Sequence, residues 1–145
     1  MLIEDLIERL KERVPDFSGR VEGALNWAEL KAQGRLPQTT PAANVISVGL
    51  QGGTPDAAAG LFRQAYEEVF GVILTFRNND AVGRRAFERS EEIKRAVIEA
   101  VAGWSPEGVL GTFRLARGTL VAIDAGTLSF QIDFAIGDQL RIDPS

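Results

Sequence analysis

The chain has 145 residues, 16 basic against 20 acidic side chains and a formal net charge of −4, and it contains neither cysteine nor histidine. Without thiols and imidazoles, disulfide frameworks, cysteine nucleophiles, Ser-His-Asp triads and Cys- or His-ligated metals are excluded. A net acidic chain lacks the excess of Lys and Arg that a phosphate backbone requires, so we expect no sequence-specific nucleic-acid binding. No apolar run approaches the ~20 residues of a membrane span, and the first residues lack the basic region of a signal peptide, so no membrane contact is expected.

The length favours a single domain over residues 1–145. Pro15 should end a first, amphipathic helix, since the residue before a proline is driven out of the helical region. The apolar residues of that helix recur at steps of three and four and therefore share one face: Leu2, Ile3, Leu6, Ile7, Leu10 and Val14. A short strand at Arg20–Gly23 and a helical segment at Ala24–Lys31 are expected next.

The middle of the chain is predicted to pass from a strand into a loop. Residues Ala43–Leu50 are rich in β-branched side chains, which favour a strand. The stretch Gln51–Gly60 combines turn-forming residues with small side chains, so we expect an exposed, flexible loop there. Its glycines do not form a phosphate-binding loop, because the Gly-Lys-Ser/Thr signature is absent.

The longest strand and the longest helix are expected to follow one another. Ala65–Arg77 contains a nearly unbroken apolar run from Val69 to Phe76, which is typical of a central strand covered on both faces. Asp80 is a suitable N-cap for a helix over residues 81–102, and Gly103 is a suitable C-cap.

The last part of the chain is predicted to be a meander of short strands, at Gly111–Ala116, Thr119–Ile123, Leu128–Phe134 and Gln139–Ile142. Helices and strands therefore mix without regular alternation. This pattern favours an α+β fold with a mostly antiparallel sheet, flanked by the N-terminal helix and one long helix.

Carboxylates are the remaining route to acid-base or metal chemistry. Glu67 and Glu68 are neighbours on a strand, so their side chains point to opposite faces and cannot form a catalytic pair. Four late aspartates could converge on a cation, although their spacing matches no known calcium or magnesium loop: Asp124, Asp133, Asp138 and Asp143. A small carboxylate-dependent hydrolase is therefore kept as a less favoured alternative.

The two tryptophans, Trp27 and Trp104, each lie near the end of an element. Either ring could anchor the core or form part of a protein interface, because both roles favour large aromatic side chains. The sequence alone leaves both roles open.

The order of several short patterns resembles the tail terminator, or tail completion, proteins of long-tailed bacteriophages, particularly the Mu-like family, whose wider relatives include the lambda tail terminator. The resemblance covers residues 2–142, and its most specific pattern is Gly103-Trp104-x-Pro106 after the long helix. The other patterns are Val21-Glu22-Gly23-Ala24, Leu36-Pro37, Phe70-x-Val72-x-Leu74-x-Phe76-Arg77, Asn79-Asp80-x-x-Gly83, and a terminal hairpin with Gly118, Leu120 and Phe134.

The resemblance implies a structural subunit without catalysis or cofactor. Six copies would form a ring that sits on the last ring of the tail tube, stops its polymerisation and offers a surface to the head-tail connector protein. The subunit would be made in the host cytoplasm and end in the virion tail, with a lumen through which DNA can pass. Another head-tail connector or adaptor protein is the closest alternative. The candidate interface residues are Trp27, Gly52, Gly53, Thr54, Pro55 and Trp104.

Overall fold

The structure is a computed structural model, and it describes residues 2–57, 60–77, 84–124 and 126–143. In chain order its elements are α1 (Leu2–Arg13), the 3-10 turn η1 (Pro15–Phe17), β1 (Val21–Glu22), α2 (Ala24–Ala32), β2 (Ala42–Asp56), β3 (Phe62–Arg77), α3 (Arg84–Val101), β4 (Arg114–Asp124) and β5 (Thr127–Ile142). The predicted N-cap Asp80 lies outside the described residues.

The five strands form one sheet in the order β1-β2-β3-β5-β4. β1 is parallel to β2, whereas the other neighbouring strands are antiparallel. This sheet, with α1 and the long helix α3, confirms the predicted α+β class. β3 lies between β2 and β5 and is buried from Phe70 to Phe76, as its apolar run predicts.

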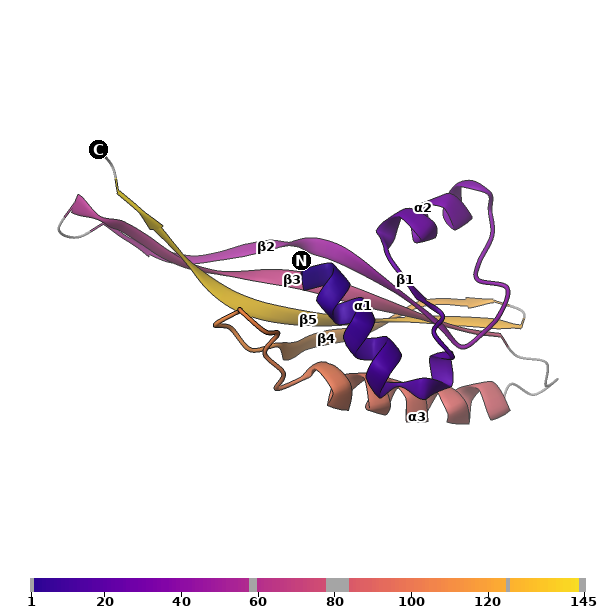
Figure 1. Cartoon of the computed structure of the whole chain (residues 1–145). Coiled ribbons are helices and arrows are strands. Elements are labelled where there is room, and N and C mark those ends of the chain that lie inside the picture. The colour runs from indigo at the N-terminus through magenta and orange to yellow at the C-terminus, as the bar shows by residue number, and fades with distance from the viewer. Residues whose placement is uncertain (1, 58–59, 78–83, 125, 144–145) are drawn as a thin grey trace.

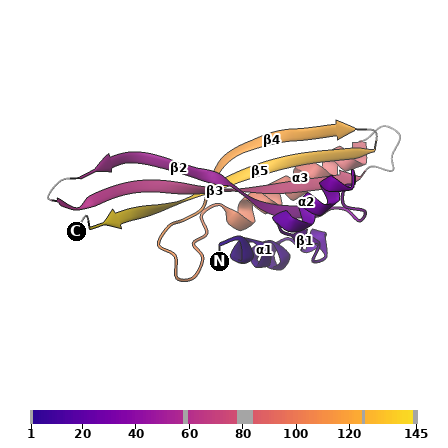
Figure 2. The same cartoon turned by 90° about the horizontal axis from the view of Figure 1, so that it is seen from above.

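The helices cover the two faces of the sheet unequally (Figures 1 and 2). α1 and α3 pack on one face, here called the α1/α3 face, against the side chains of Phe70, Val72, Leu74 and Phe76. α2 lies on the other face, the α2 face. Asn44 points to this face, because side chains alternate along a strand, and its amide donates to the Gly23 carbonyl (3.3 Å) and to Asn26 Oδ1 (3.0 Å).

The N-terminal predictions are confirmed by the structure. α1 ends at Arg13, and Pro15 begins the 3-10 turn η1. Leu6 and Leu10 are fully buried, as expected for one apolar face. The long helix α3 ends at Val101. Gly103 follows it with φ +82°, a left-handed conformation that suits glycine after a helix.

The predicted loop over residues 51–60 is wrong for its first part. Residues 51–56 belong to β2 and stay paired with β3 as far as Asp56 opposite Arg63. Glycine and proline are tolerated here because β2 is an edge strand at this point and its ladder contains two register shifts, one after Ser47 and one after Gly52. Residues 58–59 lie outside the described part of the chain.

The predicted division of the last part of the chain into several short strands is also wrong. β4 and β5 are two long strands, and Gly118 and Gly137 lie inside them rather than at turns. β5 pairs with β3 from Thr127 to Ile142 without a register shift, and this continuous ladder carries the strand past its glycine.

One end of the sheet extends beyond the helices (Figures 1 and 2). This arm comprises residues 50–56 of β2, 62–68 of β3 and 137–142 of β5, which are paired with one another. All described residues of β2 and β5 in the arm are exposed. The arm therefore presents both of its faces to the surroundings.

Candidate assembly surfaces

The sheet has two unlike free edges. Within the described residues, β4 pairs with β5 alone, so the outer side of β4 from Arg114 to Asp124 is unpaired. On the opposite side, β1 covers β2 only at Ala43 and Asn44, and the rest of β2 has no outer partner strand in the described part of the chain. Unpaired strand edges expose backbone donors and acceptors that can add a further strand.

Both free edges carry large exposed apolar side chains. On β4 these are Leu115, Leu120, Val121 and Ile123, exposed by 44%, 49%, 49% and 72%. On β2 they are Val48 and Leu50, exposed by 47% and 72%. Clusters of exposed apolar side chains mark protein-protein contact surfaces more often than isolated ones do.

A bidentate salt bridge between Glu67 and Arg114 connects the arm to the start of β4. Arg114 Nε donates to Glu67 Oε2 at 2.8 Å, and Arg114 Nη2 donates to Glu67 Oε1 at 2.7 Å. The pair spans β5 at Ala135 and Gly137, where small residues leave room above the strand. The hydrogen bonds from Arg114 lower the pKa of Glu67, and those same bonds raise the pKa of Arg114.

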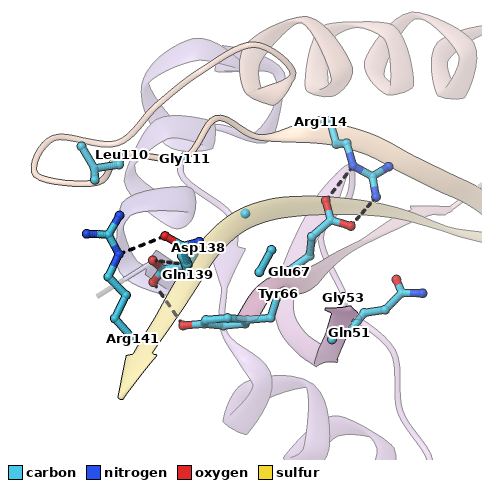
Figure 3. Close-up of a pocket in the computed structure, with 13 residues that line it drawn as sticks. Gln51, Gly53, Tyr66, Glu67, Leu110, Gly111, Arg114, Asp138, Gln139 and Arg141 are labelled. Carbon is cyan, nitrogen blue, oxygen red and sulfur yellow. Dashed lines mark hydrogen bonds and ion pairs between the residues drawn. The ribbon is translucent and has the colours of Figure 1, made fainter. Parts of the chain in front are cut away.

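A groove of about 830 Å³ runs beside this ion pair (Figure 3). Its lining includes Gln51, Tyr66, Glu67, Arg114 and Asp138. The Tyr66 hydroxyl donates to Asp138 Oδ2 at 3.1 Å, and this hydrogen bond to a carboxylate raises the pKa of Tyr66. Four of the polar side chains in the groove are therefore paired with one another, Tyr66 with Asp138 and Glu67 with Arg114.

The loop before β4 closes one end of the groove. A Cβ built at Gly111 would collide with the Gly137 carbonyl oxygen and the Ile136 side chain, so only glycine fits this close approach. Leu110, next to it, is fully exposed (103%). The tight packing of Gly111 on β5 therefore places a free apolar side chain at the rim.

Trp104 packs at the base of α3 and contributes to the core. Its ring stacks on Phe113, with centroids 5.7 Å apart and an interplanar angle of 17°. The Arg9 guanidinium carbon lies 4.9 Å from the ring centroid. Trp104 remains half-buried, so part of the ring is accessible. A core contribution is therefore shown, and its interface role stays a prediction.

Trp27 lies on the other face of the sheet, in α2. It borders a cavity of about 260 Å³ together with Lys31 of α2 and with Val121 and Ala122 of β4. None of the α2 residues, all of which the structure describes, is fully buried. Trp27 therefore lies over the α2 face of the sheet, close to β4 and β5.

The structure does not bring the candidate interface residues together within one subunit. The arm contains residues 52–55, and α2 contains Trp27. Trp104 follows α3 in the chain and packs against the core on the α1/α3 face. Sequence reasoning missed the Glu67–Arg114 pair and the exposed edge of β4. The run Leu120-Val121-Ala122-Ile123 is apolar on both faces of a strand, and this was the available signal for the edge.

Among the late aspartates, Asp133 and Asp138 do not converge. Asp133 and Asp138 lie an odd number of residues apart on β5 without a register shift, so their side chains point to opposite faces of the sheet. In the part of the chain that the structure describes, no group of three acidic or metal-ligating side chains could hold a metal ion. The hydrolase alternative therefore gains no support from these residues.

No helix within the described ranges is long and apolar enough to span a membrane.

The fold and these surfaces define a small structural subunit. Its distinctive features are two free sheet edges that carry exposed apolar side chains. Comparison with known families identifies its kind: residues 1–144 match the family described as phage tail terminator protein, and the chain belongs to that family. A comparison with curated proteins found no match.

A solved structure shares the fold. A chain of the virion of a native gene transfer agent particle is 15% identical to this chain and superimposes with a TM-score of 0.54. The alignment covers 96% of this chain and 95% of that chain. At this identity the likeness concerns the fold alone.

Proposed function

We propose that this protein ends the growth of a phage tail tube. Several copies form a ring that sits on the last ring of tube subunits. The resemblance to tail terminators implies six copies. The upper surface of the ring binds the head-tail connector protein, and its lumen lets DNA pass. The protein acts through stoichiometric protein-protein contacts and has no catalytic step. It assembles in the host cytoplasm and then remains in the virion tail.

The match of residues 1–144 to the tail terminator family carries this proposal. The sheet edges support it, because a ring requires two different surfaces on each subunit that complement one another. The free edges of β2 and β4 lie on opposite sides of one sheet and meet that requirement.

A polymerisation assay tests the proposal. Tail-tube protein from the same phage is allowed to form tubes with and without this protein, and tube lengths are measured by electron microscopy. We expect shorter tubes with this protein bound at one end, and long tubes in its absence. Light scattering on the protein alone should show a species larger than a monomer.

Two outcomes contradict the proposal. Unchanged tube lengths together with a strict monomer at all concentrations would exclude a terminator ring. A ring that binds connector protein but neither binds nor shortens tubes would instead identify an adaptor elsewhere in the head-tail junction.

A further inference from the structure

We infer that neighbouring copies join by pairing the arm edge of β2 in one copy with the β4 edge of the next, which makes the sheet continuous across the subunit boundary. The inference rests on the proposed ring and specifies its contact. The occupant of each edge is a second copy of this chain, and the contact is heterologous, with β2 facing β4 rather than itself.

The strand directions are compatible. β3 is antiparallel to both β2 and β5, and β4 is antiparallel to β5. β4 therefore runs antiparallel to β2 in each subunit. When the sheets of two copies are placed edge to edge with the same face outward, β4 of one copy meets β2 of the other as an antiparallel pair, which forms a regular hydrogen-bonded ladder.

The charges select one register. Asp56 is the one charged residue on the free edge of β2 from Val45 to Asp56, whereas β4 begins with Arg114 and Arg117. Antiparallel pairing brings the end of β2 beside the start of β4. Asp56 then lies opposite Arg117, and opposite charges on facing strands favour pairing.

The same register matches the apolar side chains. The segments 50–56 and 117–123 are equal in length, and each contains one register shift. Setting Asp56 opposite Arg117 therefore sets Leu50 opposite Ile123. These two apolar side chains have the same exposed fraction, 72%, and each would cover the other.

The faces of the sheet also agree. Leu50 lies opposite Glu68 on β3, and Ile123 lies opposite Leu128, which lies opposite Phe76 on β3. Because positions 68 and 76 of β3 are an even number of residues apart, Leu50 and Ile123 both point to the α1/α3 face. By the same count, Asp56 and Arg117 both point to the α2 face.

The pairing brings the candidate interface residues of the arm close to Trp27 of the neighbouring copy, whereas Trp104 stays outside this contact. The arm edge with Gly52–Pro55 of one copy lies beside β4 of the next, near its Val121 and Ala122, which border the cavity below Trp27. Gly52 and Gly53 present no bulk at the bulge between Leu120 and Ala122. Residues that are far apart within one subunit are therefore neighbours across the boundary.

Disulfide trapping tests this register, since the chain has no cysteine of its own. The variants Leu50→Cys and Ile123→Cys are purified separately, mixed, oxidised and run on a non-reducing gel. Facing residues of an antiparallel pair have Cα atoms about 4.5–5.5 Å apart, within the range of a disulfide. We expect a covalent dimer in the mixture and monomer in either variant alone. The pair Asp56→Cys and Arg117→Cys should give the same result on the other face.

The control pairs Glu12→Cys with Ile123→Cys, because Glu12 is exposed but lies on α1, outside both paired strands. This mixture should stay monomeric on the gel. A dimer from either single variant alone indicates a symmetric contact and overturns the inference. Absence of both predicted dimers overturns it as well, provided that light scattering shows the proteins assembled. A wild-type protein that does not assemble contradicts the proposed ring itself.

Discussion

At the scale of single residues, two contacts hold the start of β4 against β5 and the arm. Gly111 packs on the backbone of β5 at Gly137, and Arg114 reaches across β5 to Glu67. The residues involved are distant in sequence, and nothing in the local pattern links them. Together these contacts determine where the free edge of β4 begins.

Substitution Gly111→Ala should destabilise the protein by about 1–3 kcal/mol, because the added methyl group collides with backbone that cannot move aside. Denaturant unfolding measures this change. Gly137→Ala is the matched control from the other side of the same contact, since its Cβ would meet only the Tyr66 carbonyl oxygen at 4.0 Å. Equal losses in both variants would contradict the close approach at Gly111.

Substitution Glu67→Gln should lower the melting temperature slightly at neutral pH. The folded-state pKa of Glu67 lies below its ordinary value, so the carboxylate stabilises the fold above about pH 4 and this contribution is lost as the pH falls through the lowered pKa. The difference between wild type and variant should therefore shrink as the pH is lowered from 7 to 3. Melting curves at both pH values test this, with Glu29→Gln on α2 as the control. A difference of the same size at pH 7 and pH 3 would exclude the ion pair as its cause.

At the scale of elements, periodicity predicted the parts of the fold that bury a regular face. The spacing of Leu6 and Leu10 predicted α1, and the run ending at Phe76 predicted the central strand. Gly52, Gly53 and Pro55 suit turns and therefore predict a loop, whereas pairing with β3 decides the conformation of this part of β2. Local propensity carries no information on that long-range ladder.

The candidate site was less predictable than the fold. The aromatic ring of Trp27 and the loop predicted at Gly52 and Gly53 mark these residues as interface candidates, but the strand order, which sequence does not show, determines which strand edges are free. The pairing of Glu67 with Arg114 likewise depends on the β3-β5-β4 order. Long-range topology was therefore the missing information in both cases.

The helix α2 depends on one buried amide. Asn44 is 1% exposed and donates to both Gly23 and Asn26, so Asn44→Ala removes two hydrogen bonds and leaves their acceptors without this donor. We expect a loss of about 1–3 kcal/mol and faster hydrogen exchange in α2. Asn26→Ala removes only one of the two bonds and should cost less. Unchanged exchange rates in α2 for Asn44→Ala would show that other contacts hold the helix.

At the scale of the whole molecule, the shape of the subunit suits repeated assembly. A sheet with one free edge on each side would join further copies without limit unless the rotation between neighbours closes a ring. Its edges carry exposed leucine, valine and isoleucine, which would promote aggregation unless another copy covers them. A closed ring covers every edge and leaves no subunit at an end.

The mass of the assembled protein tests this account most directly. Native mass spectrometry of the purified chain should show a closed oligomer, with the family resemblance predicting six times the mass of the protomer. The oxidised double variant Leu50→Cys/Ile123→Cys should give an oligomer of the same mass, in which disulfides link the copies covalently around the ring. A monomer or a dimer as the largest species at every concentration would contradict the central claim that this protein works as a ring.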